Sequence, residues 1–285
     1  MRFIAFSRNS SPVLGARLGE EVIDLTALGL PATLDELLAQ GAAGMSAARD
    51  AVARAKSRLP LASLRYLPPV LNPAKAIAVG LNYVDHAAES PYKDAPNYPV
   101  LFHRFRSSWV AHNEPLLRPK VSHHLDYEAE LVVLIGTGGR YIPKAKALEH
   151  VAGYSLFNEG SIRDYQMKST QWMMGKNFDR SGSFGPEMVS ADELPPGAAG
   201  LAIKCRLNGE VMQNANTRDM IFDVATLVHI CSDAMALAPG DIIISGTPAG
   251  VGFGRKPPIF MRPGDVCEVE VEGVGVLRNH IEDEA

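Results

Sequence analysis

The sequence contains few cysteines, and those it has are far apart. Cys205, Cys231 and Cys267 form no closely spaced pair within 285 residues. An odd, scattered set argues against a disulfide framework and a zinc ribbon, and indicates a reducing compartment. No apolar run is long enough for a transmembrane helix, and Met1 leads directly into a strand pattern in place of a signal peptide. We therefore expect a soluble cytoplasmic protein with no membrane partner.

Clusters of basic residues are also lacking. The chain has 28 Lys and Arg against 32 Asp and Glu, a net charge of -4, and no basic run interleaved with aromatic residues. This balance argues against a nucleic-acid partner. The hydrophobic content of 46% and the length allow a large core, in one domain or in one domain plus a smaller unit.

Several common catalytic motifs are missing from the sequence. It has no Gly-x-Ser-x-Gly elbow, no Gly-Lys-Ser/Thr phosphate loop and no His-Glu-x-x-His helix. The glycine-rich run 246–252 is not clearly followed by a helix, so a nucleotide-binding loop is disfavoured. A loop that lines a cavity is the favoured interpretation, and a plain turn between strands remains open.

The hydrophobic pattern divides the chain into two units. The first, a small N-terminal α+β domain over residues 1–65, combines short strands with two helices, at 3–6, 14–18, 21–24, 34–39 and about 45–58. A proline-punctuated segment then resembles a linker. The second unit, 70–285, has strands at 76–79, 242–245, 266–271 and 274–277, and helices at 84–89 and 221–236. Close strand spacing with few long helices predicts an α+β, β-rich fold.

Two acidic residues precede the most apolar segment of the chain. In Asp126-Tyr127-Glu128-Ala129-Glu130, read as a strand that continues through Ile135, Glu128 and Glu130 lie on one side, roughly 7 Å apart. If both carboxylates were buried without partners, they would repel each other. Mg²⁺ or Mn²⁺ bound to their oxygens would remove this repulsion. Two ordinary glutamates on a half-exposed sheet face are the alternative.

Two helical pairs could add polar groups to the same site. His86 and Glu89 are three residues apart on a predicted helix, where a carboxylate can orient an imidazole base. Arg163 and Gln166 have the same spacing and could point a cation and an amide into one pocket. Lys176 lies between glycine-containing turns. Read singly, each of these two pairs is more often found on the surface, and Lys176 could be an exposed loop lysine.

Five motifs together resemble the fumarylacetoacetate hydrolase family over about residues 74–280. They have a fitting order and spacing, and they read Gly80-Leu81-Asn82-Tyr83-x-x-His86-x-x-Glu89, Asp126-Tyr127-Glu128-Ala129-Glu130-Leu131, Asn158-Glu159-x-Ser161-x-Arg163-Asp164-x-Gln166, Gly175-Lys176-Asn177-Phe178 and Ser245-Gly246-Thr247-Pro248-x-Gly250-Val251-Gly252. The resemblance implies a fumarylacetoacetase C-terminal-like mixed β-sandwich roll after the N-terminal domain, and a homodimer.

The resemblance also implies a set of metal ligands, with two departures from the family pattern. Glu128 and Glu130 would be two ligands of Mg²⁺ or Mn²⁺. The third position is usually an aspartate, and here it is Glu159, whose extra methylene shifts the carboxylate by about one bond. Arg104 stands where many members carry lysine and would take over its contact with the substrate.

The remaining site residues follow from the same comparison of motifs. His86 and Glu89 match the water-activating dyad of the family's hydrolases, and Lys176 matches the residue that stabilises an oxyanion. Arg163, Gln166 and Thr247 match positions that hold substrate oxygens. The substrate's tail would contact variable loops, such as 90–98 and 254–260.

Three functions are compatible with these residues. The first is metal-dependent hydrolysis of a carbon–carbon bond in a 2,4-dioxo acid of the acylpyruvate or fumarylpyruvate type, with water activated by His86 and Glu89. The second uses the same enolate chemistry without water, as a decarboxylase, isomerase or hydratase of a 2-oxo or 2-hydroxymuconate-like acid. The third is a non-catalytic, metal-dependent binding protein, against which the presence of His86 and Lys176 argues.

Overall fold

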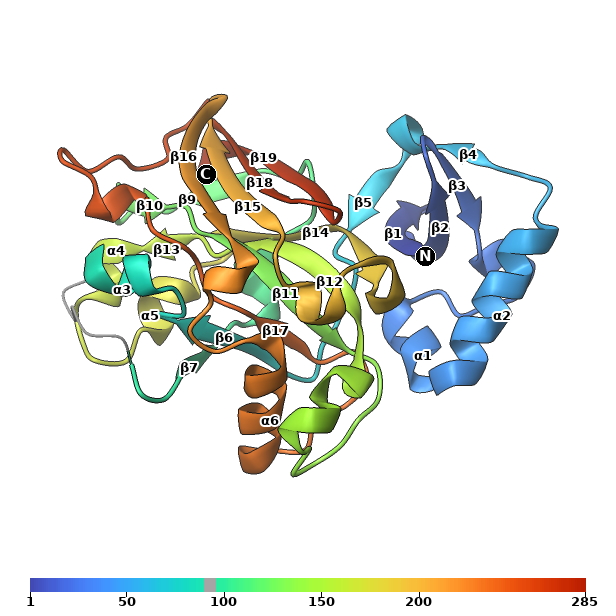
Figure 1. Cartoon of the computed structure of the whole chain (residues 1–285). Helices are drawn as coiled ribbons and strands as arrows, with labels where there is room; N and C mark the ends of the chain where they lie inside the picture. Colours follow the sequence, from blue (N-terminus) through green and yellow to red (C-terminus); the bar gives the residue numbers. More distant parts are fainter. Residues whose placement is uncertain (90–95) are drawn as a thin grey trace.

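The computed structural model describes residues 1–89 and 96–285, and it has the β-rich α+β fold expected from the sequence (Figure 1). Its α-helices are α1 (Leu34–Ala39), α2 (Gly41–Arg54), α3 (Val84–Glu89), α4 (Arg163–Gln166), α5 (Met173–Lys176) and α6 (Val224–Ala234). Two of them are single turns, because glycines and polar residues interrupt the chain around 160–177.

A large twisted sheet runs through the whole molecule. Its order is β4-β3-β2-β1-β14-β12-β11-β17-β6-β7, with β5 beside β1 and β8 beside β14. Its strands are β1 (Arg2–Arg8), β2 (Ser11–Leu18), β3 (Glu21–Asp24), β4 (Leu59–Pro60), β5 (Arg65–Leu67), β6 (Ala76–Gly80), β7 (Val100–His103), β8 (Trp109–Val110), β11 (Ala129–Ile135), β12 (Val151–Asn158), β14 (Gly182–Ser190) and β17 (Ile242–Ile244).

A second sheet packs against the first. It has the order β16-β15-β18-β19-β9 and consists of β9 (Leu116–Arg118), β15 (Ala202–Leu207), β16 (Glu210–Asn216), β18 (Val266–Val271) and β19 (Gly275–Asp283). The short strands β10 (Leu125–Asp126) and β13 (Ser161–Ile162) pair antiparallel as a separate two-stranded sheet. The turn from β15 to β16 is the tight hairpin that an Asn-Gly pair favours, since Asn208 and Gly209 both have positive φ angles, 54° and 84°.

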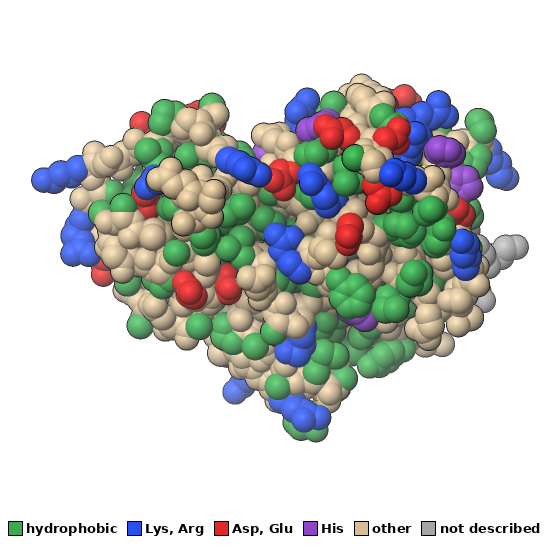
Figure 2. Space-filling model, turned by 180° about the vertical axis from the view of Figure 1, so that it is seen from behind, with side chains coloured by type: hydrophobic (Ala, Val, Ile, Leu, Met, Phe, Trp, Pro, Cys, Tyr) green, Lys and Arg blue, Asp and Glu red, His purple; other side chains and the backbone are tan. Residues whose placement is uncertain are grey.

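The N-terminal unit forms a smaller lobe that is continuous with the large sheet. β1 pairs antiparallel with β14, and β4 and β5 of the predicted linker pair with β3 and β1. Thr33 caps α1, because its side chain accepts a hydrogen bond from the backbone N–H of Glu36. A notch separates the two lobes in the space-filling view (Figure 2). The boundary between residues 65 and 70 stays a prediction.

Strand β11 lies in the middle of the core and is buried on both faces. Leu131 and Val133 pack into the cluster shared with the second sheet and α6, whereas Val132 and Leu134 pack into the cluster that contains α1 and α2. A strand covered on both sides loses the usual alternation of apolar and polar residues, which explains the continuous apolar run.

Several predicted elements differ from the structure. The strand expected from Asp126 onward is interrupted, since Tyr127 and Glu128 lie between β10 and β11. Helix α2 begins at Gly41 and ends at Arg54, before an extended Ala55, so the range 45–58 was wrong by about four residues at each end. Helix α6 begins at Val224, because the side chain of Asp223 accepts from the Thr226 N–H as its N-cap.

Candidate functional site

The motif residues converge on one small pocket, which is lined by residues of α3, α4 and α5, of the start of β11 and of the loop after β17. Its volume is about 40 Å³, room for only a few water molecules. Polar lining residues are His86, Glu89, Glu128, Glu130, Arg163, Gln166, Lys176 and Thr247, and apolar ones include Leu81, Phe102, Met167, Trp172, Val251 and Phe253. Eight of the ten predicted site residues therefore share this pocket, and Arg104 and Glu159 do not line it.

Glu128 is buried between two cations. The Lys176 Nζ donates to its Oε2 at 2.7 Å, and the Arg163 Nη2 lies 2.6 Å from its Oε1 as an ion pair without hydrogen-bond alignment. Burial acts to raise the pKa of this carboxyl, but Arg163 and then Lys176 outweigh it and lower the pKa to about 2. Lys176, which could have been an exposed loop residue, is only 3% exposed at the end of α5.

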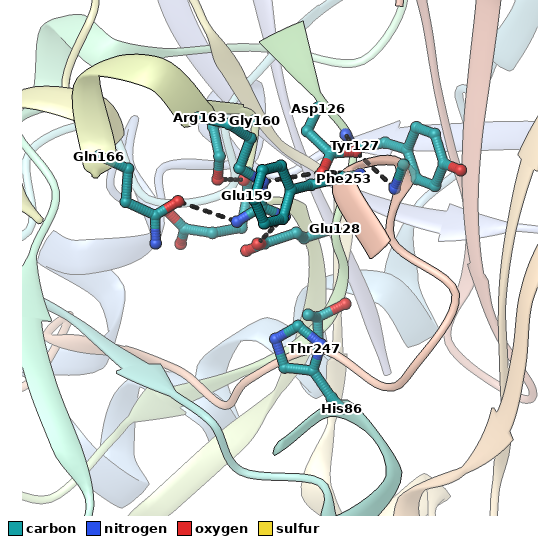
Figure 3. Close-up of polar contacts among 12 residues, drawn as sticks. His86, Asp126, Tyr127, Glu128, Glu159, Gly160, Arg163, Gln166, Thr247 and Phe253 are labelled. Carbon is teal, nitrogen blue, oxygen red and sulfur yellow. Dashed lines mark hydrogen bonds and ion pairs between the residues drawn. The ribbon is translucent and has the colours of Figure 1, made fainter. Parts of the chain in front are cut away.

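Arg163 is fixed from its other side by Asp126, as the close-up shows (Figure 3). The Arg163 Nε donates to Asp126 Oδ2 at 2.8 Å, and the backbone N–H groups of Gly252 and Phe253 donate to the same carboxylate. The charges of Glu128 and then of Asp126 raise the pKa of Arg163 despite its burial. The Arg163 Nη1 donates to Gln166 Oε1 at 2.9 Å, which leaves the amide nitrogen of Gln166 as a donor for a ligand.

Glu130 and Glu159 bring two more carboxylates close to Glu128. The backbone N–H of Gly246 donates to Glu130 Oε2 at 2.5 Å. Burial, and then the charges of Glu159 and Glu128, raise the pKa of Glu130 well above its usual range. Glu159 is fully buried and accepts from Arg104 Nη1 at 2.5 Å through its Oε1.

His86 lies across the pocket from Gln166 and Arg163 (Figure 3). Its Nδ1 is buried, lacks a hydrogen-bond partner in the described structure, and lies 3.9 Å from Glu89 Oε2. Glu89 instead accepts from the backbone N–H of Gly250, at 3.0 and 2.9 Å. Burial acts to raise the pKa of Glu89, but the interactions with His86 and Gly250 lower it. The expected dyad is therefore close in space but not hydrogen-bonded.

Thr247 and the glycine-rich loop form the wall next to His86. The Thr247 hydroxyl donates to the Ala129 carbonyl at 3.0 Å and accepts from Gln213 Nε2 at 2.8 Å. Gln213 Oε1 in turn accepts from the Ala129 N–H at 2.9 Å. The loop after β17 thus lines a cavity, as the favoured interpretation of this glycine-rich segment predicted.

The acidic residues suit a hard divalent cation by their chemistry. Their donors are all carboxylate oxygens, Glu159 Oε2 is buried with no hydrogen-bond partner in the described structure, and the repulsion at Glu130 is of the kind a cation relieves. As the side chains stand, no three Asp, Glu, His or Cys of the described residues are grouped to enclose an ion. Glu128 is drawn instead toward Lys176 and Arg163. A bound cation would therefore compete with these two residues for Glu128.

Two residues important to the site were not singled out from the sequence. Asp126 opens the acidic motif, but its role depends on contacts with α4 and with residues 252–253, which are distant in the chain. Gln213 lies on β16 and no local pattern marks it. Residues 90–95 of the loop expected to contact the substrate's tail lie outside the described residues.

The chain belongs to a family of enzymes, the fumarylacetoacetate hydrolase family. The model of the fumarylacetoacetate hydrolase C-terminal domain matches residues 75–282. The match confirms the resemblance drawn from the five motifs, and the chemistry of each member has to be argued from its site.

Particular relatives cover nearly the whole chain. The mitochondrial oxaloacetate tautomerase fahd2 of Xenopus laevis is 38% identical over 289 residues, covering 99% of this chain and 90% of its own length. A fumarylacetoacetate hydrolase from Exiguobacterium antarcticum is 35% identical, with a TM-score of 0.87 and full coverage of both chains. Maleylpyruvate hydrolase from Sphingobium sp. SYK-6, solved with manganese(II) and pyruvate, is 28% identical, with a TM-score of 0.84 and full coverage of both.

These comparisons bear on several expectations. One structural relative holds a divalent metal, in agreement with the expected cofactor class, and the choice between magnesium and manganese stays a prediction. The tautomerase relative is named as mitochondrial, so a cytoplasmic location stays a prediction, as does the homodimer. Among the helices of residues 1–89 and 96–285, none has the length and apolar composition needed to cross a membrane.

Proposed function

We propose that the protein catalyses keto–enol tautomerisation of a small 2-oxo dicarboxylic acid of the oxaloacetate type. The observation that carries this proposal is the arrangement of His86 and Lys176 around one small pocket of about 40 Å³. Such a pocket suits a compact substrate, with a base at one side and an oxyanion-stabilising cation at another. Similarity to oxaloacetate tautomerases over nearly the full chain supports the same substrate class.

The reaction moves one proton and consumes no water. His86 takes a proton from C3 of the keto acid, the C2–C3 double bond forms, and negative charge develops on the C2 oxygen. Lys176 donates a hydrogen bond to that oxygen, which then receives the proton to give the enol. Gln166 and Arg163 hold substrate oxygens. All three donor residues keep their positions through buried contacts with Glu128 or with each other.

A divalent metal forms part of the proposal. Glu128, Glu130 and Glu159 would hold Mg²⁺ or Mn²⁺, which when bound would supply Lewis acidity toward the 2-oxo acid. The all-oxygen donor set and the unpartnered Glu159 Oε2 support this assignment. In this proposal Lys176 and Arg163 also neutralise the charge of Glu128 when no divalent cation is bound.

The test follows the enol absorbance of oxaloacetate under conditions in which spontaneous tautomerisation is slow. We expect His86→Asn to reduce the catalysed rate by about 10²- to 10⁴-fold, because it removes the proton acceptor. His103→Asn is the matched control, since His103 is exposed and outside the pocket lining. A His86→Asn rate within threefold of the native rate would rule out this role for His86.

Hydrolysis of an acylpyruvate is the second candidate, favoured by the position of Glu89 beside His86. A modest rotation would bring their 3.9 Å separation to hydrogen-bond distance and create the dyad needed to activate water. A panel of oxaloacetate, acetylpyruvate and fumarylpyruvate, with product analysis, separates the candidates. Hydrolysis alone adds water and releases two organic acids, and unchanged hydrolysis by His86→Ala with metal retained would exclude the dyad. Stoichiometric binding of these acids without turnover would indicate a binding protein.

A further inference from the structure

The Arg104 guanidinium is completely satisfied by contacts within the protein. Its Nε donates to Ser108 Oγ at 2.9 Å, and its Nη2 donates to the Ser108 carbonyl at 3.0 Å and to Ser181 Oγ at 3.3 Å. Its Nη1 donates to Glu159 Oε1 at 2.5 Å and to the Gly160 carbonyl at 3.1 Å. All five N–H groups therefore have partners, and none is left for a substrate.

The backbone is shaped closely around this side chain. A Cβ atom at Gly182 would lie 2.7 Å from Arg104 Nη2, and one at Gly160 would lie 1.7 Å from the Ser181 carbonyl oxygen. The ring of Phe157 lies 5.4 Å from the guanidinium carbon and covers it. Both side chains of the Arg104–Glu159 ion pair are fully buried, with exposures of 0%. Arg104 is thus held in one orientation by its surroundings.

Glu159 is held at one oxygen only. Its Oε1 carries the contact with Arg104, and the Lys176 Nζ lies 4.0 Å from the same atom. Its Oε2 is buried and has no hydrogen-bond partner in the described structure. A buried carboxylate oxygen without a partner is energetically costly, so its presence beside two other acidic residues points to a ligand.

We propose that Arg104 is a positioning residue, which fixes Glu159 through Oε1 and leaves Oε2 for the divalent cation. This inference rests on the metal site of the proposed function. A glutamate has one more rotatable bond than an aspartate, and a rigid guanidinium removes the additional freedom that the longer side chain brings. The pair Arg104–Glu159 then acts as one unit, and Arg104 acts on the cation through Glu159 without touching the substrate.

The test measures Mn²⁺ affinity of the folded protein without substrate, by titration calorimetry and by the EPR signal of free Mn²⁺. We expect Arg104→Met to weaken Mn²⁺ binding by about 10- to 100-fold, a usual effect of losing a partner of a metal ligand. Arg104→Lys keeps the positive charge but loses the planar guanidinium with its five N–H groups, and it should weaken Mn²⁺ binding less. In a Glu159→Gln background, Arg104→Met should change the affinity by less than about threefold, because its effect passes through Glu159.

Arg106→Met is the matched control. Arg106 lies two residues away and donates to the carbonyls of Leu71 and Trp109, so its loss should leave Mn²⁺ affinity unchanged. The inference would be overturned if Arg104→Met bound Mn²⁺ with native affinity. It would also be overturned if Arg104→Met weakened Mn²⁺ binding as much in the Glu159→Gln background as it does in the native protein. If Arg104→Met does not fold, Arg104→Lys in the two backgrounds decides by the same criterion. A native protein that binds no Mn²⁺ would overturn the proposed metal site and this inference together.

Discussion

Replacing Asp126 by asparagine tests the support of Arg163 by a single buried carboxylate. Asp126 is fully buried and accepts four hydrogen bonds. Its Oδ1 accepts from the N–H groups of Tyr127 and Gly252, and its Oδ2 accepts from Arg163 Nε and the Phe253 N–H. An asparagine has one acceptor oxygen, so in either orientation its NH₂ group would face two donors.

The expected cost follows from these contacts. Breaking a buried ion pair by removing one charge usually costs about 3–5 kcal/mol, because the remaining charge stays buried without compensation. Arg163 would retain Glu128, so we expect the lower part of this range for the free energy of unfolding. Because Arg163 would also lose its orientation, we expect the KM for a 2-oxo acid to rise at least tenfold, or about 1.4 kcal/mol.

Urea unfolding and steady-state kinetics on the same preparation provide the measurement. Asp164→Asn is the control, on the same helix as Arg163, since Asp164 Oδ1 accepts from Ser122 Oγ at 2.6 Å and an amide oxygen can replace it. We expect this control to cost less than about 1 kcal/mol. An Asp126→Asn variant that unfolds within 1 kcal/mol of the native protein, with an unchanged KM, would refute the reasoning.

Three further perturbations have defined outcomes. Gly175→Ala would place a Cβ 2.4 Å from the backbone of Gln166, so we expect a loss of about 1–3 kcal/mol in thermal unfolding and a lower kcat, and an unchanged protein would contradict this packing. Burial, and then the charges of Arg278 and Arg17, lower the pKa of His112 to about 4, so an unfolded chain takes up this proton near pH 6.5 and the folded one only near pH 4. The free energy of unfolding should therefore fall as the pH drops through this window, by at most about 3 kcal/mol. In urea unfolding at a series of pH values, His112→Asn should make this dependence on pH weaker. An unchanged dependence in the variant would mean that other groups cause the loss of stability. Chelator treatment should lower the melting temperature, and Mn²⁺ at 100 times its Kd should restore about 2.7 kcal/mol, whereas identical melting with and without metal would count against the cation site.

The sequence by itself determined much of the local structure. The capping residue Thr33, the hairpin at Asn208 and Gly209, and the continuous apolar run of β11 each depend on neighbours in the chain, and the structure has all three. The motifs also determined the family, because five short patterns in a fixed order constrain a fold more strongly than composition does. Eight of the ten predicted site residues consequently lie around one pocket.

Only the tertiary structure decided which charges are paired. Arg104 contacts Glu159 across 55 residues, and Arg163 contacts Asp126 across 37. No local pattern encodes such pairs, because they form where loops and the short helix α4 bring together residues that are distant in the sequence. The sequence thus determined which residues supply carboxylates, imidazole and cations. Burial and long-range contact decided that Glu128 is held by two cations and that Glu89 accepts from a backbone N–H. They also decided that Arg104 pairs with Glu159 and does not line the pocket.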